Sequence, residues 1–330
     1  MKLDWPIEIA GTGSYLPDRV ITNIDLAARL DTSDEWIVQR TGIRARRYAA
    51  EQESTLVLAT RASQMALERS GLAPSDIDLI IVGTATPEHT LPSTACELQA
   101  ALGCGWIPAF DVAAACSGFL FGFITAAQYL ASGMARNVLV VGAETLSRIT
   151  DQEDRSVVIL MGDGAGAAVL RRAGDERGRL LSARFGADGA RARAIWIPAG
   201  GAAEPASVRT VNERLHYMRM NGREVYKFAI SQMCAEVQGA LDEAGITIDQ
   251  LKLLVPHQSN QRIIEAACQK LGLSIERVMI NIDRYGNTSA ASVPVALDEA
   301  FSAGRLRSGD HVMMVAFGAG LTWASTLLRI

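Results

Sequence analysis

The segment Gly71-Leu-Ala-Pro-Ser-Asp-Ile-Asp-Leu-Ile-Ile-Val82 indicates how the whole chain is built, because its pattern returns in Gly245-Ile-Thr-Ile-Asp-Gln-Leu-Lys-Leu-Leu-Val-Pro256. Each segment starts at a glycine typical of a helix end, passes through a short polar turn and finishes in an apolar run typical of a buried strand. The offset between the copies is constant here, because Ile77 is as far from Leu251 as Gly71 is from Gly245. Order and constant offset favour an internal duplication over a chance likeness between two βα stretches.

The residues that follow both segments extend the duplication, because each copy continues with a strand, a turn, an apolar helix and a second strand. In the first copy the turn holds Cys116, the helix ends near Gly133 and the second strand is Val138–Val141. In the second copy the first strand is Val278–Ile282 and the turn holds Asn287. The helix of this copy ends near Gly304, and its second strand is His311–Ala316. The offset drifts here, since it is slightly shorter between Leu102 and Leu271 and between Cys116 and Asn287.

Alternating helices and buried strands predict an α/β protein whose mixed sheets are covered by helices on both faces. We expect two duplicated βαβαβ-type halves, residues 1–175 and 176–330, packed as a layered α-β-α-β-α sandwich. The polar stretch 173–178 is the best candidate for the join. Residues 186–209, rich in Gly and Ala, are expected to form a long loop over the second half.

Composition limits the classes of function. The 330 residues are 49% hydrophobic, enough for a large core, and 32 Lys and Arg stand against 36 Asp and Glu. The resulting charge of −4 provides no basic field to gather nucleic acid. Five cysteines without a C-x-x-C pair fit neither a disulfide framework nor a zinc site, so we expect reduced thiols and no metal. No apolar run follows Lys2, which favours a cytoplasmic protein without a secretory signal.

Residues 112–135 carry no charge, and a run of that length can span a bilayer. The run also holds polar residues and three glycines, and it leads through Arg136 into the β-branched strand Val138–Val141. These features favour a buried core helix followed by a buried strand, without membrane insertion.

Three residues in the predicted turns are candidates for chemistry. Cys116 lies where a strand ends and an apolar helix begins, and the positive end of a helix dipole helps a thiol lose its proton. His257 follows a buried strand, at the edge where α/β sheets present catalytic groups. Asn287 occupies the matching turn of the second copy, and a pseudo-twofold axis brings both turns to the centre. The alternatives are a small buried cysteine, an exposed loop histidine and an ordinary turn asparagine.

Two further stretches suggest binding. The Gly-rich turn Ala316–Gly320 offers backbone N–H groups to a developing oxyanion. Thr32 and Glu35 form a predicted capping box that opens a helix, and four arginines lie among the eight residues 40–47. The arginines indicate either a solvated face or an anion site, and Trp36 nearby offers a surface on which an aromatic base can stack.

The chain resembles the β-ketoacyl-acyl carrier protein synthase III family, thiolase-fold enzymes that start bacterial fatty-acid synthesis. The matching motifs cover nearly the whole chain in the family's order: Asp34-Glu-Trp-Ile-Val-Gln-Arg-Thr-Gly-Ile43, Asp111 through Gly118, Gly162-Asp-Gly-Ala-Gly-Ala167, His257-Gln-Ser-Asn-Gln-Arg262, Tyr285-Gly-Asn-Thr-Ser-Ala-Ala291 and Phe317-Gly-Ala-Gly320.

The resemblance implies a Cys116-His257-Asn287 triad in a thiolase-like fold. Cys116 would take the acyl group from an acyl-CoA, and His257 and Asn287 would stabilise the enolate formed when malonyl-acyl carrier protein loses CO₂. The resemblance also implies a homodimer without a permanently bound cofactor, in which acyl-CoA is a substrate. The remaining implied roles are an oxyanion hole from the N–H groups of Cys116 and Ala319, CoA binding by Trp36, Arg40, Arg155 and Asn260, packing of Phe317 on the triad, and docking of the carrier protein by Arg262.

Two positions depart from the family pattern. Ala319 stands where the family commonly has Gly, which leaves the backbone N–H in place and adds a methyl group to the pocket. Leu91 aligns with a position, often Phe, that reaches into the partner subunit's acyl pocket. A smaller side chain there favours a longer or branched primer.

Other functions stay open from the sequence. A papain-type hydrolase also uses Cys, His and Asn in this order, although the chain lacks the motif of that class around Cys116. A catalytically silent module that binds CoA or carrier protein is a second alternative. A third is a related condensing enzyme of secondary, polyketide-type metabolism.

Overall fold

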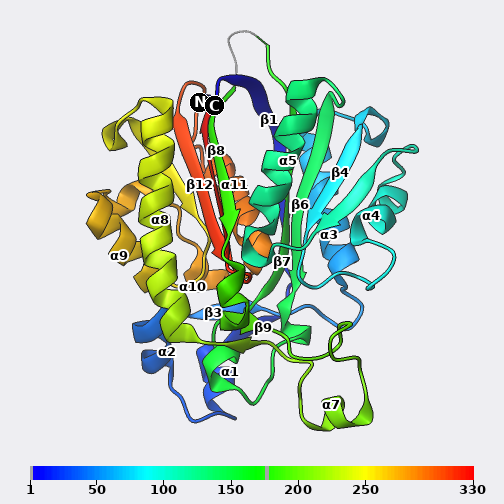
Figure 1. Cartoon of the computed structure of the whole chain (residues 1–330), viewed down its shortest axis with the longest axis vertical. Helices are drawn as coiled ribbons and strands as arrows, with labels where there is room; N and C mark the ends of the chain where they lie inside the picture. The colour runs from blue at the N-terminus through cyan, green and yellow to red at the C-terminus, as the bar shows by residue number, and fades with distance from the viewer. Residues whose placement is uncertain (1–2, 175–177) are drawn as a thin grey trace.

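A computed structural model describes residues 3–174 and 178–330 and places nine strands in one mixed sheet (Figure 1), ordered β11-β12-β13-β8-β1-β7-β6-β4-β5. The strands of this sheet are β1 Trp5–Tyr15, β4 Leu79–Gly83, β5 Ala109–Val112, β6 Asn137–Thr145, β7 Asp163–Arg172, β8 Arg179–Ala187, β11 Leu251–Pro256, β12 His311–Gly318 and β13 Thr322–Arg329. Two small sheets pair β2 Val20–Thr22 with β3 Ala45–Arg47 and β9 Ile195–Trp196 with β10 Arg219–Met220.

Each half of the chain contributes its own run of strands to the large sheet. In the first half β5, β4 and β6 are parallel, and β7 and β1 follow antiparallel. In the second half β11 and β12 are parallel, and β13 and β8 follow antiparallel. The two halves meet where β1 pairs with β8, at Trp5 with Leu180 and at Pro6 with Arg179.

Helices cover the outer faces and fill the space between the halves (Figure 1), which confirms the predicted layered sandwich. Helices α5 and α11 lie at the centre, α3 and α4 cover the first half, and α8 and α9 cover the second. The helices are α1 Asn23–Ala27, α2 Asp34–Thr41, α3 Thr55–Ser70, α4 Thr94–Leu102, α5 Gly118–Ser132, α6 Arg155–Val158, α7 Val208–Asn212, α8 Gly222–Ala244, α9 Gln261–Leu271, α10 Ile282–Tyr285 and α11 Ser292–Ser302.

The uncharged run predicted as a core helix is α5. Residues 115–132 are apolar and long enough to cross a membrane, the one such stretch among the described residues. Its side chains instead pack against strands of both halves, and Phe119, Leu120 and Phe123 are fully buried. The interpretation as a core helix is therefore confirmed.

The duplication is more regular in the structure than in the sequence. The starts of α5 and α11, and likewise those of β6 and β12, keep the same offset as Gly71 and Gly245. A short 3₁₀ turn precedes each central helix, η2 Ala115–Ser117 and η7 Ser289–Ala291. The first residue of each turn has a positive φ, 46° at Ala115 and 48° at Ser289. The two copies thus differ in length only locally, and the original offset between them is restored at the turn before the central helix.

Three local expectations were wrong. Residues 278–282 form no strand, since only an isolated bridge joins Val278 to Leu254, and α10 begins at Ile282. Ser33, not Thr32, caps α2, because its extended backbone lets its hydroxyl accept the N–H of Trp36 at 3.1 Å. Residues 186–209 are not one loop, because β8, a 3₁₀ turn, β9 and the start of α7 occupy much of them. The predicted boundary between residues 175 and 176 lies outside the described residues.

Candidate active site

One apolar cavity of about 490 Å³ brings together most of the residues singled out in the sequence. Its walls come from both halves, because η2 and η7 end close to the carboxyl ends of β11 and β12. The predicted residues that line it are Arg40, Cys116, His257, Asn260, Asn287, Phe317 and Ala319.

Cys116 lies in the 3₁₀ turn between β5 and α5, and the end of β12 presses against it. A Cβ atom at Gly318 would lie 2.7 Å from the Cys116 nitrogen, so only glycine permits this approach. The left-handed conformation of Ala115 turns the chain sharply just before the thiol. The backbone therefore fixes Cys116 at the cavity wall.

The Cys116 thiol is protonated at neutral pH in this pocket. Burial raises its pKa to about 12, and the negative charge of Glu144 acts in the same direction. The sequence predicts the opposite effect, from the dipole of α5, but Cys116 precedes the first residue of that helix by two positions. Loss of hydration favours the neutral thiol, so the thiolate needed for attack has to form as its proton is transferred away.

His257 follows β11 and is almost completely buried. Its backbone N–H donates to the Val315 carbonyl oxygen at 2.7 Å. The Phe317 ring stands edge-on to the imidazole, with 5.6 Å between the ring centroids. Burial lowers the pKa of His257 to about 3. The imidazole is therefore neutral at pH 7 and offers one N–H donor and one nitrogen acceptor.

Asn287 is held by both its backbone and its side chain. Its N–H donates to the Leu160 carbonyl oxygen at 2.7 Å, and its carbonyl oxygen accepts the Gly162 N–H at 2.9 Å. The side-chain oxygen accepts the Ser289 N–H at 2.9 Å. With that oxygen engaged, the Nδ2 group is the part of the amide that can donate to a molecule in the cavity.

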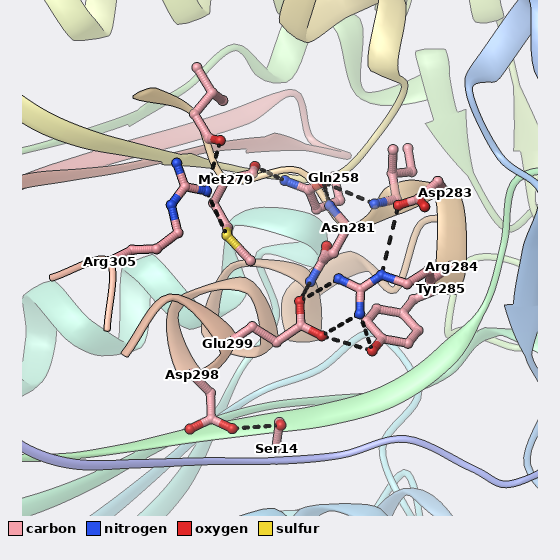
Figure 2. Close-up of polar contacts among 12 residues, drawn as sticks. Ser14, Gln258, Met279, Asn281, Asp283, Arg284, Tyr285, Asp298, Glu299 and Arg305 are labelled. Atoms are coloured by element: carbon pink, nitrogen blue, oxygen red, sulfur yellow. Dashed lines mark hydrogen bonds and ion pairs between the residues drawn. The ribbon is translucent and has the colours of Figure 1, made fainter. Parts of the chain in front are cut away.

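The amide of Gln258 ties the histidine loop to the segment that leads to Asn287 (Figure 2). Its Nε2 donates to the Pro256 and Met279 carbonyl oxygens at 2.8 and 3.0 Å, and its Oε1 accepts the N–H groups of Asn281 and Ile282 at 3.0 and 3.2 Å. All four hydrogen bonds of a buried amide are thus satisfied. The sequence did not single out Gln258.

Glu299 anchors the other end of this segment (Figure 2). Its carboxylate accepts hydrogen bonds from both NH groups of Arg284 at 2.9 Å, from the Tyr285 hydroxyl at 2.7 Å and from the Asn281 amide at 2.9 Å. The Asn281 backbone N–H donates to Gln258 and its side-chain amide donates to Glu299. Hydrogen bonds therefore connect the histidine loop, α10 and α11.

Glu144 is a buried carboxyl beside the cavity that sequence analysis missed. It lies near the end of β6 and accepts hydrogen bonds from the Thr86 hydroxyl at 2.7 Å and from the N–H groups of Ala85 and Ala290 at 3.1 and 3.4 Å. Burial raises its pKa to about 7. Glu144 thus connects the segment after β4 to η7. The one sequence signal for this role is the position of Glu144 at the end of an apolar strand.

Several candidates lie at or beyond the cavity mouth. The Asn260 amide donates to the Arg40 carbonyl oxygen at 3.1 Å. Two guanidinium groups contact the Trp36 ring, with their carbons 5.3 Å (Arg40) and 5.0 Å (Arg155) from its centroid. Arg155 also bonds Asp31. Trp36 and Arg155 do not line the cavity itself.

Two further predicted residues do not line the cavity. Arg262 is exposed on the first turn of α9. Leu91 is 87% exposed and does not line the cavity of its own chain. Among the described residues no cluster of His, Cys, Asp and Glu has the form of a metal site.

Comparisons with known proteins agree over nearly the whole chain. The family model for 3-oxoacyl-[acyl-carrier-protein (ACP)] synthase III matches residues 110–189, and the model for its C-terminal part matches residues 241–330. A β-ketoacyl-[acyl-carrier-protein] synthase III of Caldanaerobacter subterraneus subsp. tengcongensis is 51% identical over 321 residues, 97% of each chain.

Solved structures give the same result. The 3-oxoacyl-[acyl-carrier-protein] synthase III of Aquifex aeolicus is 45% identical with a TM-score of 0.91, over 98% of this chain and 100% of that one. The priming β-ketosynthase of the R1128 polyketide pathway is more distant in sequence, at 34% identity and a TM-score of 0.89, over 100% of this chain and 98% of that one.

Proposed function

The chain belongs to the β-ketoacyl-acyl carrier protein synthase III family, and we propose that Cys116, His257 and Asn287 are its catalytic residues. It is an acyltransferase that condenses an acyl-CoA primer with malonyl-acyl carrier protein and so starts fatty-acid synthesis. The observation that carries the assignment is the convergence of one thiol and two neutral hydrogen-bond donors on a single apolar cavity.

In the first half-reaction the Cys116 sulfur attacks the thioester carbonyl of the acyl-CoA. The bond from sulfur to the acyl carbon forms, the bond to CoA breaks, and CoA leaves as a thiol with the proton that Cys116 gave up. The N–H groups of Cys116 and Ala319 stabilise the oxyanion of the tetrahedral intermediate. The close approach of Gly318 to the Cys116 backbone supports this role, because it brings the end of β12, which leads into Ala319, against the turn that carries Cys116.

In the second half-reaction malonyl-acyl carrier protein loses CO₂. The electron pair of the broken carbon–carbon bond becomes an enolate, whose oxygen accepts hydrogen bonds from His257 and the Asn287 amide. The enolate carbon then attacks the acyl-Cys116 carbonyl and forms the new carbon–carbon bond, the bond from the acyl carbon to sulfur breaks, and the Cys116 thiolate takes up a proton from solvent. Burial keeps His257 neutral, which suits a hydrogen-bond donor rather than a lasting cation.

We assign CoA binding to the mouth of the cavity. Trp36 offers a flat aromatic surface for the adenine of CoA, and the guanidinium groups of Arg40 and Arg155 beside it offer positive charge for the CoA phosphates. Asn260 and Arg40, joined by a hydrogen bond, line the path inward. Arg262, exposed on α9 beside this mouth, is the residue we assign to docking of the acidic carrier protein.

We also propose a homodimer that forms along β5. This strand ends the large sheet and has no partner on its outer edge among the described residues, and such an edge readily pairs with another chain. Trp106 before β5 is fully exposed, as is most of Leu91. A dimer would cover both, and Leu91 would reach the acyl pocket of the partner subunit. Light scattering at micromolar protein is expected to give twice the chain mass, and a fully active monomer would contradict the dimer.

The test of function is turnover with a panel of primers. Purified protein with acetyl-CoA and malonyl-acyl carrier protein is expected to form acetoacetyl-carrier protein and CO₂ in equal amounts. Leu91, smaller than Phe, predicts that branched and medium-length acyl-CoAs are also accepted. Turnover only with unusual acyl-CoAs or a small-molecule acceptor would instead support the polyketide-type alternative. Location in the cytoplasm and the lack of a bound cofactor stay predictions.

A further inference from the structure

The buried partner of His257 is a serine hydroxyl. Ser292 is the first residue of α11 and is almost completely buried. Its Oγ lies 2.6 Å from the His257 Nδ1, and it also accepts the Gln258 N–H at 3.4 Å. Neither the motifs nor the roles assigned above include Ser292.

A hydroxyl partner differs from the usual partner of a catalytic histidine. In hydrolase triads a carboxylate or amide oxygen accepts the Nδ1–H and leaves Nε2 as a proton acceptor. The Ser292 oxygen already accepts the Gln258 N–H, whereas its single proton is free to point at the nearby Nδ1. With Nδ1 as acceptor, the ring proton resides on Nε2, the nitrogen on the opposite edge of the ring. His257 lines the cavity, so this N–H is available to a bound molecule.

We propose that Ser292 is a positioning residue whose hydroxyl donates to Nδ1 and holds neutral His257 as its Nε2–H tautomer, a donor to the malonyl enolate. The inference rests on the proposed function. An uncharged partner gives an imidazolium little stabilisation, so the ring keeps one N–H aimed at the cavity while negative charge develops on the substrate oxygen. The Gln258 side chain fixes the backbone next to His257, and the Gln258 backbone N–H donates to the Ser292 hydroxyl, so both members of the pair are held by Gln258.

The test combines Ser292→Ala, Ser292→Thr as a control that keeps the hydroxyl, and a direct reading of the tautomer. Nitrogen NMR of the wild-type imidazole, assigned with His257→Ala, is expected to show the proton on Nε2. Ser292→Ala should lower kcat for malonyl decarboxylation by about 10- to 100-fold, the size of effect found when the hydrogen-bond partner of a metal-binding histidine is removed. Acylation of Cys116 should fall less, and Ser292→Thr should recover most of the loss.

Thermal unfolding of Ser292→Ala checks that the fold is kept. We expect a folded variant, because removing one oxygen atom creates no steric conflict. A proton on Nδ1 in the wild type, or wild-type decarboxylation by Ser292→Ala, would overturn the inference while the proposed function stands. A wild-type protein that fails to decarboxylate malonyl-carrier protein would instead overturn the proposed function, and the NMR result would still report the tautomer.

Discussion

Gly318→Ala tests how tightly the end of β12 fixes the nucleophile. The added Cβ would lie 2.7 Å from the Cys116 nitrogen and 3.2 Å from both the Cys116 Cβ and the Ser117 nitrogen. Ordinary contact begins at 3.4 Å, so the backbone at Cys116 has to retreat by about 0.7 Å. Two of the three neighbouring atoms are main-chain nitrogens, which cannot rotate out of the way.

The displacement is expected to cost more in catalysis than in stability. Overpacking of a buried site typically costs about 1–3 kcal/mol, which a chain of this size tolerates. A shift approaching 1 Å of a reacting group can cost about 10²-fold in rate. Both the Cys116 sulfur and its N–H move together, so we expect a loss of about 10²-fold in the rate constant for acylation, with little change in CoA affinity.

Rapid-quench measurement of Cys116 acylation by acetyl-CoA, together with thermal unfolding, separates these effects. The matched control is Gly201→Ala, where the added Cβ meets no atom within 4 Å and the rate should equal that of the wild type. A Gly318→Ala variant that acylates at the wild-type rate, or an equal loss in Gly201→Ala, would show that the end of β12 does not fix Cys116.

Three other sets of variants separate the roles of the site residues. His257→Ala and Asn287→Ala should each lower malonyl decarboxylation by about 10²- to 10³-fold while Cys116 acylation stays measurable by mass spectrometry, and normal decarboxylation would contradict their role. Arg262→Glu should raise KM for malonyl-carrier protein far more than KM for acyl-CoA, and the difference should shrink with added salt because exposed charges are screened over about 8 Å; equal changes in both would mean that Arg262 supports the histidine loop. Glu144→Gln places an NH₂ group against the N–H and O–H groups that now donate to the carboxylate, and it should lower the free energy of unfolding in chemical denaturation by about 1–3 kcal/mol. An unchanged denaturation midpoint would contradict these hydrogen bonds.

Local patterns predict the positions of the turns well but not the polar groups behind them. Cys116, His257 and Asn287 each follow or precede an apolar run, so their places at the sheet edge are readable from the sequence. Glu144 and Ser292 are single polar residues beside apolar runs, and their partners are set by tertiary packing. The bond from the Ala290 N–H to Glu144 joins residues 146 positions apart. No local signal reports such a contact.

The remaining errors have similar physical causes. Thr32 and Ser33 are both residue types that cap helices, and the extended backbone at Ser33 places its hydroxyl on the Trp36 N–H. The pKa of Cys116 depends on how much water the folded pocket excludes, whereas the sequence reveals only the nearby helix. Residues 278–282 have the composition of a strand, but their strand pairing is limited to a single bridge from Val278 to β11. Backbone groups of Met279, Asn281 and Ile282 bond the Gln258 side chain instead.

Mass spectrometry of the intact protein after incubation with acetyl-CoA reports directly whether Cys116 is the nucleophile. The wild type should gain the mass of one acetyl group per chain, the label should map to Cys116, and malonyl-carrier protein should then remove it. Cys116→Ser should gain no such mass, since a serine hydroxyl in this apolar pocket is a far weaker nucleophile. Equal labelling of Cys116→Ser, or a label on one of the other four cysteines, would rule out Cys116 as the acylated residue.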